Sequence, residues 1–147
     1  MKIKMFGKKS VSALLFWVFL FLLTLVVIST AMYIPNLIQD ASSIMLLNLA
    51  PLVSYFALLI PLVFLFYAFK KRVLFTKQCI KYLYLFAVFN SLSLIFTWVT
   101  FVFFLGMEHI DMFSLSFPNI LLITFALFLT SIFKQGFYVQ QENELTI

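Results

Sequence analysis

Four polar side chains recur on one face of an apolar stretch and are the residues best placed to do chemistry. These residues are Asn90, Ser93, Thr97 and Thr100, which are separated by 3, 4 and 3 positions. In a helix this spacing puts all four on one stripe. One interpretation is an inward-facing packing surface, on which amide and hydroxyl groups form hydrogen bonds between helices. The other is the lining of a polar path or a ligand pocket, and we favour the packing surface.

A second group of chemically capable side chains lies close together in sequence: Glu108, His109 and Asp111. Two carboxylates and an imidazole could bind a divalent metal ion. However, three residues within four positions of a short loop rarely converge on one ion, and His109 is the single histidine. The chain has no HExxH motif, and its 3 glycines do not form a phosphate-binding loop. The sequence therefore predicts no catalytic residue, no metal site, no cofactor and no enzymatic activity.

The segments that carry these residues are unusually apolar. Of the 147 residues, 65% are hydrophobic and 10% are charged, and 21 are Phe. Soluble domains average about 45–50% apolar and about 25% charged residues. This composition excludes a soluble enzyme, a disordered protein and a coiled coil, and it predicts an integral membrane protein.

Four segments are long enough to cross the hydrocarbon core, which takes about 20 apolar residues. None has Asp, Glu, Lys or Arg in its interior, and they comprise residues 11–33, 44–69, 82–105 and 112–133. The connections between them are short, which forces neighbouring helices to be antiparallel. The sequence therefore predicts an all-α fold: one membrane domain (1–147), an up-down-up-down bundle of four transmembrane helices, and a tail at 134–147.

Proline and glycine predict where these helices bend, begin and end. Pro61 lies well inside the second segment, where its missing N–H predicts a kink. Pro118 follows Ser116 in a pattern typical of a helix start, so we expect the fourth helix to begin there. Gly136 predicts the end of that helix, with Lys134 in its last turn.

The basic residues all fall on one side of the predicted bundle. Four lysines precede the first segment, Lys134 follows the fourth, and the loop between the second and third contains Lys70, Lys71, Arg72, Lys77 and Lys81. Because basic loops stay on the cytoplasmic side of the membrane, we expect both termini in the cytoplasm. The protein itself is expected in the inner membrane. The five bases of the central loop are expected to contact anionic lipid. The net charge of +5 thus reflects topology and predicts no nucleic-acid partner. An alternative is that the first segment is a cleaved signal peptide ending near residues 29–31.

Two stretches resemble a known family. One is the loop between the second and third segments, with Phe69, Lys70, Leu74, Phe75, Thr76, Ile80 and Leu83. The other is the tail, with Glu142, Asn143, Glu144, Leu145, Thr146 and Ile147. Together they resemble a family of small bacterial four-span integral membrane proteins of unknown function, whose tails commonly end in Glu-Asn-Asp-Leu-Thr and an aliphatic residue. Glu144 stands where Asp is usual, and residues 34–43 are shorter and less polar than the corresponding segment in many members. The family is often encoded beside a small helix-turn-helix regulator, so the resemblance implies a regulatory or stress-linked role and assigns no catalytic residue.

We therefore expect a non-enzymatic accessory or regulatory protein of a bacterial inner membrane. The tail is the predicted partner-binding element, because it is polar and acidic, unlike the other segments on its side of the membrane. The competing interpretation is a frayed chain end. Two other functions stay open: a small transporter or channel subunit with the polar stripe lining its path, and an immunity or holin-like protein. A protein partner or a homo-oligomer is expected, with membrane lipids around it.

Overall fold

The structure, a computed structural model, describes residues 10–39, 43–70, 75–105 and 109–145. It is all-α and consists of α1 (Val11–Gln39), α2 (Ser43–Phe69), α3 (Lys77–Leu105) and α4 (His109–Leu145). Each helix contains a stretch that is long and apolar enough to cross a membrane. The chain is therefore a multi-pass membrane protein, as its composition predicts.

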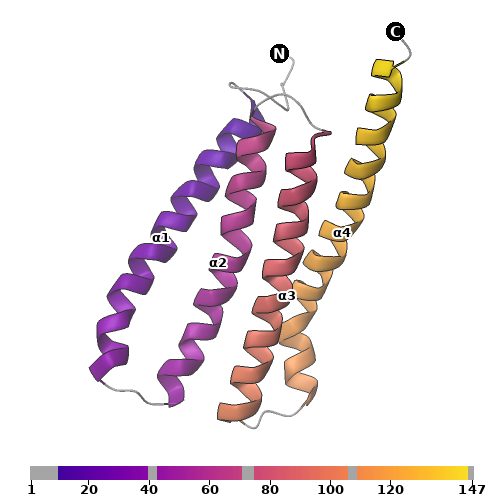
Figure 1. The fold of residues 1–147 in the computed structure, drawn as a ribbon. Helices are drawn as coiled ribbons and strands as arrows, with labels where there is room; N and C mark the ends of the chain where they lie inside the picture. Colours follow the sequence, from indigo (N-terminus) through magenta and orange to yellow (C-terminus); the bar gives the residue numbers. More distant parts are fainter. Residues whose placement is uncertain (1–9, 40–42, 71–74, 106–108, 146–147) are drawn as a thin grey trace.

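The four helices stand side by side in the order of the chain (Figure 1). α1 packs against α2, α2 against α3, and α3 against α4, each antiparallel to the previous one. This confirms the predicted all-α, up-down-up-down arrangement. α1 begins and α4 ends at the same end of the row, which we call the terminal end, and α4 projects beyond the other helices there. The cytoplasmic location of this end stays a prediction.

The start of α3 is set by a side-chain cap. The Oγ1 atom of Thr76 accepts a hydrogen bond of 3.2 Å from the backbone N–H of Cys79, and Ile80 N–H donates to the carbonyl of Thr76. Threonine is a favoured residue for this position because its oxygen satisfies an N–H that the helix leaves without a partner. α3 therefore begins at Lys77, ahead of the apolar segment that starts at Tyr82.

The bounds predicted for the fourth helix are wrong at both ends. α4 already begins at His109, so Pro118 lies inside it, and α4 continues through Gly136 to Leu145. Ser116 is buried, and its Oγ accepts a hydrogen bond from Nε1 of Trp98 on α3. Gly136 lies against the ring of Phe75, where a Cβ atom would be only 2.5 Å from the ring. The glycine therefore provides space within the helix instead of ending it.

Aromatic rings join the helices in the half of the row nearest the terminal end. The ring centroids lie between 5.2 and 5.9 Å apart in the pairs Phe16–Tyr67, Phe19–Phe66, Phe64–Tyr82, Phe69–Phe133 and Phe75–Phe133. Such pairs contribute about 0.5–1.5 kcal/mol each beyond the burial of their area. Small buried side chains at several levels of the helices let the backbones approach closely: Ala50, Ala57, Ala68, Ala87 and Ala126.

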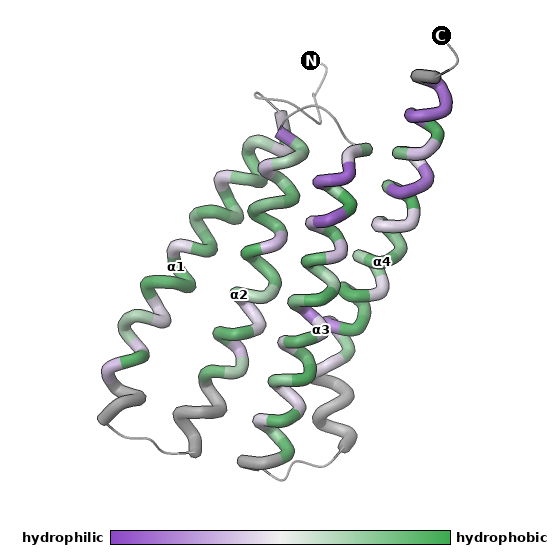
Figure 2. The backbone as a smooth tube through the Cα atoms, in the orientation of Figure 1, coloured by the Kyte–Doolittle hydropathy of each residue, from purple (hydrophilic) through white to green (hydrophobic). Residues whose placement is uncertain are grey.

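The outer surface of the row is also apolar. Large side chains such as Phe21, Phe125 and Phe128 are about 60% exposed. Figure 2 shows hydrophobic residues along most of every helix, with hydrophilic ones gathered at the start of α3 and the end of α4. An apolar surface of this extent is stable only against lipid or another protein. The high phenylalanine content therefore serves contact with lipid as well as the ring pairs.

Candidate functional site

The structure places the predicted polar stripe inside the row, on the face of α3 that meets α2 and α4. The side chains of Asn90, Ser93 and Thr100 are buried, with exposed fractions of 2%, 3% and 6%. Thr97 is partly buried. The four residues thus share one face, as their spacing predicts.

Three of the four residues make hydrogen bonds, two within α3 and one between α3 and α2. Asn90 Nδ2 donates to the carbonyl of Phe86 at 2.8 Å, and Thr100 Oγ1 donates to that of Phe96 at the same distance. The hydroxyl oxygens of Ser93 and Ser54 lie 2.8 Å apart and form a hydrogen bond between α3 and α2. The Ser54–Ser93 bond is of the kind that the packing interpretation expects, whereas the other two bonds stay within α3.

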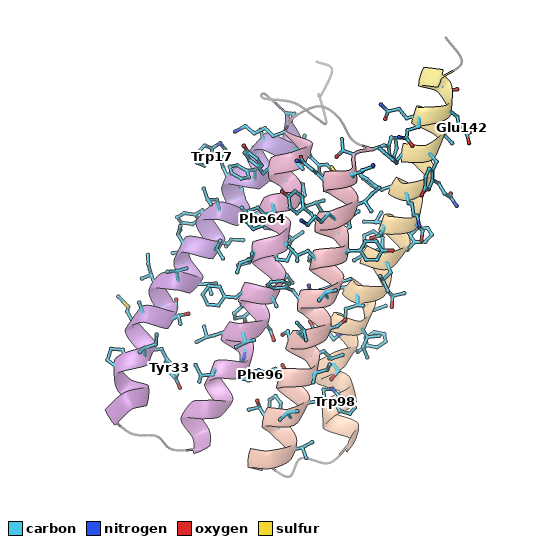
Figure 3. All side chains as sticks on the ribbon, in the orientation of Figure 1. Trp17, Tyr33, Phe64, Phe96, Trp98 and Glu142 are labelled. Carbon is cyan, nitrogen blue, oxygen red and sulfur yellow. The ribbon has the colours of Figure 1, made fainter. Side chains whose placement is uncertain are left out.

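Two partners in these polar contacts were missed by the sequence analysis. Ser54 is the single small hydroxyl residue of residues 49–69, which is a weak signal that it faces another helix. The sequence assigns no role to Trp98. In the structure its Nε1 donates a hydrogen bond to the Oγ atom of Ser116 and so joins α3 to α4. In Figure 3 Trp98 lies beside α4, toward the end opposite the terminal end.

Thr97 differs from the other three residues of the stripe. Its Oγ1 atom is buried and has no hydrogen-bond partner among the described residues. Thr97 lines a cavity of about 380 Å³ between α2, α3 and α4. The cavity is lined by Ala50, Pro51, Ser54, Tyr55, Thr97, Phe101, Pro118 and Asn119. It combines apolar walls with a few polar groups, the composition that small-molecule sites share.

Two basic residues at the terminal end, Lys70 and Lys77, lie over aromatic rings. Lys70 Nζ is 5.2 Å from the ring centroid of Phe16 and 5.6 Å from that of Trp17. Lys77 Nζ is 5.8 Å from the ring of Phe137, and Lys81 is exposed. Ammonium groups at this distance are attracted by the face of the ring. Lys71 and Arg72 lie outside the described residues, and the predicted contact with anionic lipid stays a prediction.

Residues 142–145 of the predicted partner-binding tail form the last part of α4. Glu142 and Asn143 are exposed on the helix that projects beyond the row, where Figure 3 labels Glu142. Leu145 ends the helix. The side chain of Glu144, together with Thr146 and Ile147, lies outside what the structure describes. The sequence does not predict a helical tail, because Gly136 is typical of a helix end.

Other residues considered in the sequence take less specific positions. Pro61 is fully buried inside α2, which continues on both sides of it, and the predicted kink stays a prediction. Cys79 is buried, and its Sγ accepts a hydrogen bond from Thr76 Oγ1. Glu108 and the side chains of His109 and Asp111 lie outside the described residues. Within the described part of the chain, no group of three His, Cys, Asp or Glu is placed to hold a metal ion.

Comparisons with known proteins found no matching family model, no matching curated protein and no matching solved structure. The resemblance to a bacterial four-span family is thus supported only in its general form, four long apolar helices, and no family is identified. Function must therefore be inferred from the geometry of this chain alone.

Proposed function

We propose that this protein is a non-enzymatic accessory or regulatory factor of a bacterial inner membrane, and that a partner protein recognises the end of α4 on the cytoplasmic side. The observation that carries the proposal is the continuation of α4 as a helix beyond the other three helices, with Glu142 and Asn143 exposed near its end. A tail with no role has no need of this order.

The physical reason for a helical tail lies in the rest of α4. A separate helix shorter than about 12–15 residues is marginal in water, because the first turn is costly to form. Here the membrane-crossing part of α4 provides that first turn, so residues 134–145 extend an existing helix. The base of the extension is held by Phe75 against Gly136 and by Lys77 over Phe137.

This order supports recognition, because a partner need not order the tail when it binds. Glu142 lies about 9 Å along the helix axis from Gly136, at a rise of 1.5 Å per residue. A tail already folded in this way avoids much of the entropy that a disordered segment loses on binding. With Glu142 and Glu144 as its only charged residues beyond Lys134, the tail suits a partner with a basic surface.

The open row also supports an accessory role within the membrane. Among the described residues, α1 packs on α2 and α4 packs mainly on α3, so both edges of the row present apolar faces. A partner helix or a second copy of the chain could pack on either edge. The alternatives of a transporter or channel subunit and of an immunity or holin-like protein are left without comparable support from the described contacts.

Photo-crosslinking in cells tests the proposal. A photoreactive residue at Asn143 should form an adduct with a partner protein, whereas the same residue at Val102, which is exposed on α3 at the end opposite the terminal end, should not give that adduct. Deletion of residues 142–147 should abolish the cellular phenotype and leave membrane insertion normal. The proposal is wrong if the deleted protein keeps both its phenotype and its co-purifying partners.

A further inference from the structure

We propose that copies of this protein associate through the two outer edges of the row, with the α4 edge of one copy packed against the α1 edge of the next. Exposed apolar residues define the two edges: Phe125, Ile132 and Val139 on α4, and Leu14, Phe21 and Ile28 on α1. The inference rests on the proposed function, because it names a second copy of the chain as a partner of α4.

The spacing along each edge is the first reason for the proposal. The three residues that define each edge are seven positions apart. A repeat of seven keeps one stripe of a helix in contact with a partner helix at a left-handed crossing, the crossing that most membrane helices adopt. On α1 the alternating steps of four and three of such a repeat all fall on exposed apolar residues: Leu14, Val18, Phe21, Leu25, Ile28 and Met32.

The α4 edge also continues beyond the level that lipid covers. Lys77 Nζ lies 5.8 Å from the ring of Phe137, so this level of α4 is beside the basic start of α3. Val139 lies two residues farther, about 3 Å along the helix axis, and is followed by the exposed Gln140 and Gln141. Basic side chains near helix ends reach to the membrane surface. A stripe that passes this level favours a protein partner over lipid alone.

Charge decides which edge meets which. Glu142 and Glu144 are the only charged side chains beyond residue 134, at the end of α4. At the start of α1 the charges are basic, because Lys8 and Lys9 stand just before this helix in the sequence and Lys70 Nζ lies over two of its rings. Two α1 edges in contact would bring bases together, and two α4 edges would bring acids together. Contact between an α4 edge and an α1 edge brings opposite charges together, so the partner of each edge is the other edge.

The two edges are also aligned along the membrane normal. Leu14 and Val139 lie at about the same level, because each is two residues from a ring that contacts a lysine at one end of the same loop: Phe16 with Lys70, and Phe137 with Lys77. α1 and α4 are antiparallel, as are all neighbours in the row (Figure 1). The common repeat of seven then sets Phe21 opposite Ile132, and Ile28 opposite Phe125. A second copy therefore continues the row with the same alternation of helix direction.

Cysteine cross-linking in membranes tests this inference on the full chain. Leu14→Cys and Val139→Cys are made in separate, differently tagged copies, and the native Cys79 is kept because it is buried. A short bis-maleimide should join the co-expressed copies into a dimer that carries both tags, and each variant alone should stay uncross-linked. Gln78→Cys is the matched control, because Gln78 is exposed at the terminal end on α3 and should give no dimer with Leu14→Cys.

Two further variants test the direction of the contact and its charge. A chain with both Leu14→Cys and Val139→Cys should form a series of covalent oligomers. Glu142→Lys should lower the yield of the mixed dimer by about two- to fivefold, the effect of one exposed ion pair. An unchanged yield would overturn the charge argument on which the pairing of edges depends.

The remaining outcomes separate this inference from the proposed function. It is overturned if one variant alone dimerises as readily as the mixture, which indicates contact between like edges, or if the double variant is linked only within one chain. It is also overturned if no mixed dimer forms. If Asn143 then still gives a photo-adduct with a different protein, the proposed function stands; if that adduct is absent too, both fail.

Discussion

Replacement of Gly136 by alanine tests how α4 is held at the terminal end. A Cβ atom at this position would lie 2.5 Å from two ring atoms of Phe75 and 2.9 Å from its Cγ. Carbon atoms prefer separations of about 3.5–4.0 Å. Rotation of the ring about its Cβ–Cγ bond cannot relieve the contact with Cγ, because that atom lies on the rotation axis. The whole ring must therefore move, and it packs on Phe133 at 5.4 Å.

Two opposing effects determine the size of the change in stability. Overpacking in a tightly packed region costs about 1–3 kcal/mol. Alanine is favoured over glycine within a helix by about 0.8–1.0 kcal/mol. The net effect of Gly136→Ala is therefore a loss of about 0–2 kcal/mol in the free energy of unfolding. When Phe75 is also replaced by alanine, the ring is gone and only the gain in helix propensity remains, so the same substitution should stabilise by about 1 kcal/mol.

A double-mutant cycle in detergent micelles measures this change of sign. Unfolding by SDS, followed by tryptophan fluorescence, is compared for the wild type, Gly136→Ala, Phe75→Ala and the double variant. Gln135→Ala is the matched control, because Gln135 is exposed on the same turn of α4 and should have the same effect in both backgrounds. If Gly136→Ala has equal effects with and without the Phe75 ring, the packing of Phe75 on Gly136 does not explain this glycine.

Other predictions concern orientation, the buried amide and the proline in α2. A membrane-impermeant maleimide added outside the cell should label Asp40→Cys and leave Gln140→Cys unlabelled. The reverse pattern would contradict the proposed orientation. The native Cys79 is buried and should stay unlabelled. Both Asn90→Asp and Asn90→Leu should lower the melting temperature in detergent. For Asn90→Asp, the buried carboxyl group should lower the free energy of unfolding by about 1–3 kcal/mol. Unchanged melting temperatures for both variants would refute the role of the amide. Pro61→Ala restores a backbone N–H and should lengthen the distance between spin labels in the two halves of α2; an unchanged distance would refute the predicted kink.

The number and direction of the helices could be predicted from the sequence, because a bilayer permits only long apolar helices when charged residues are confined to their ends. The positions of the helix ends could not be predicted from the sequence. Hydropathy marks where contact with lipid ends, whereas a helix ends where its hydrogen bonds lose their partners. Thr76 therefore starts α3 among polar residues, and Gly136 lies within α4 as a residue without a side chain facing the ring of Phe75.

The candidate site could be predicted only in part for a related reason. Spacing alone places Asn90, Ser93, Thr97 and Thr100 on one face, and an amide in lipid must face inward. The partner of Ser93 depends on the register between two helices, which no single segment contains. Ser54 meets Ser93 because α2 and α3 are aligned at that level, whereas Asn90 and Thr100 bond to carbonyls of α3 itself.

The contacts along the row explain why α1 is the helix least firmly attached. Lipid tails are as apolar as the side chains, so helices in a membrane gain stability mainly from close packing and from hydrogen bonds. α2, α3 and α4 have both: ring pairs near the terminal end, and the Ser54–Ser93 and Trp98–Ser116 hydrogen bonds farther along. The side-chain contacts described between α1 and α2 are ring pairs and the Lys70 contacts, all in the half near the terminal end. In Figure 1 the axes of the two helices splay apart toward the opposite end.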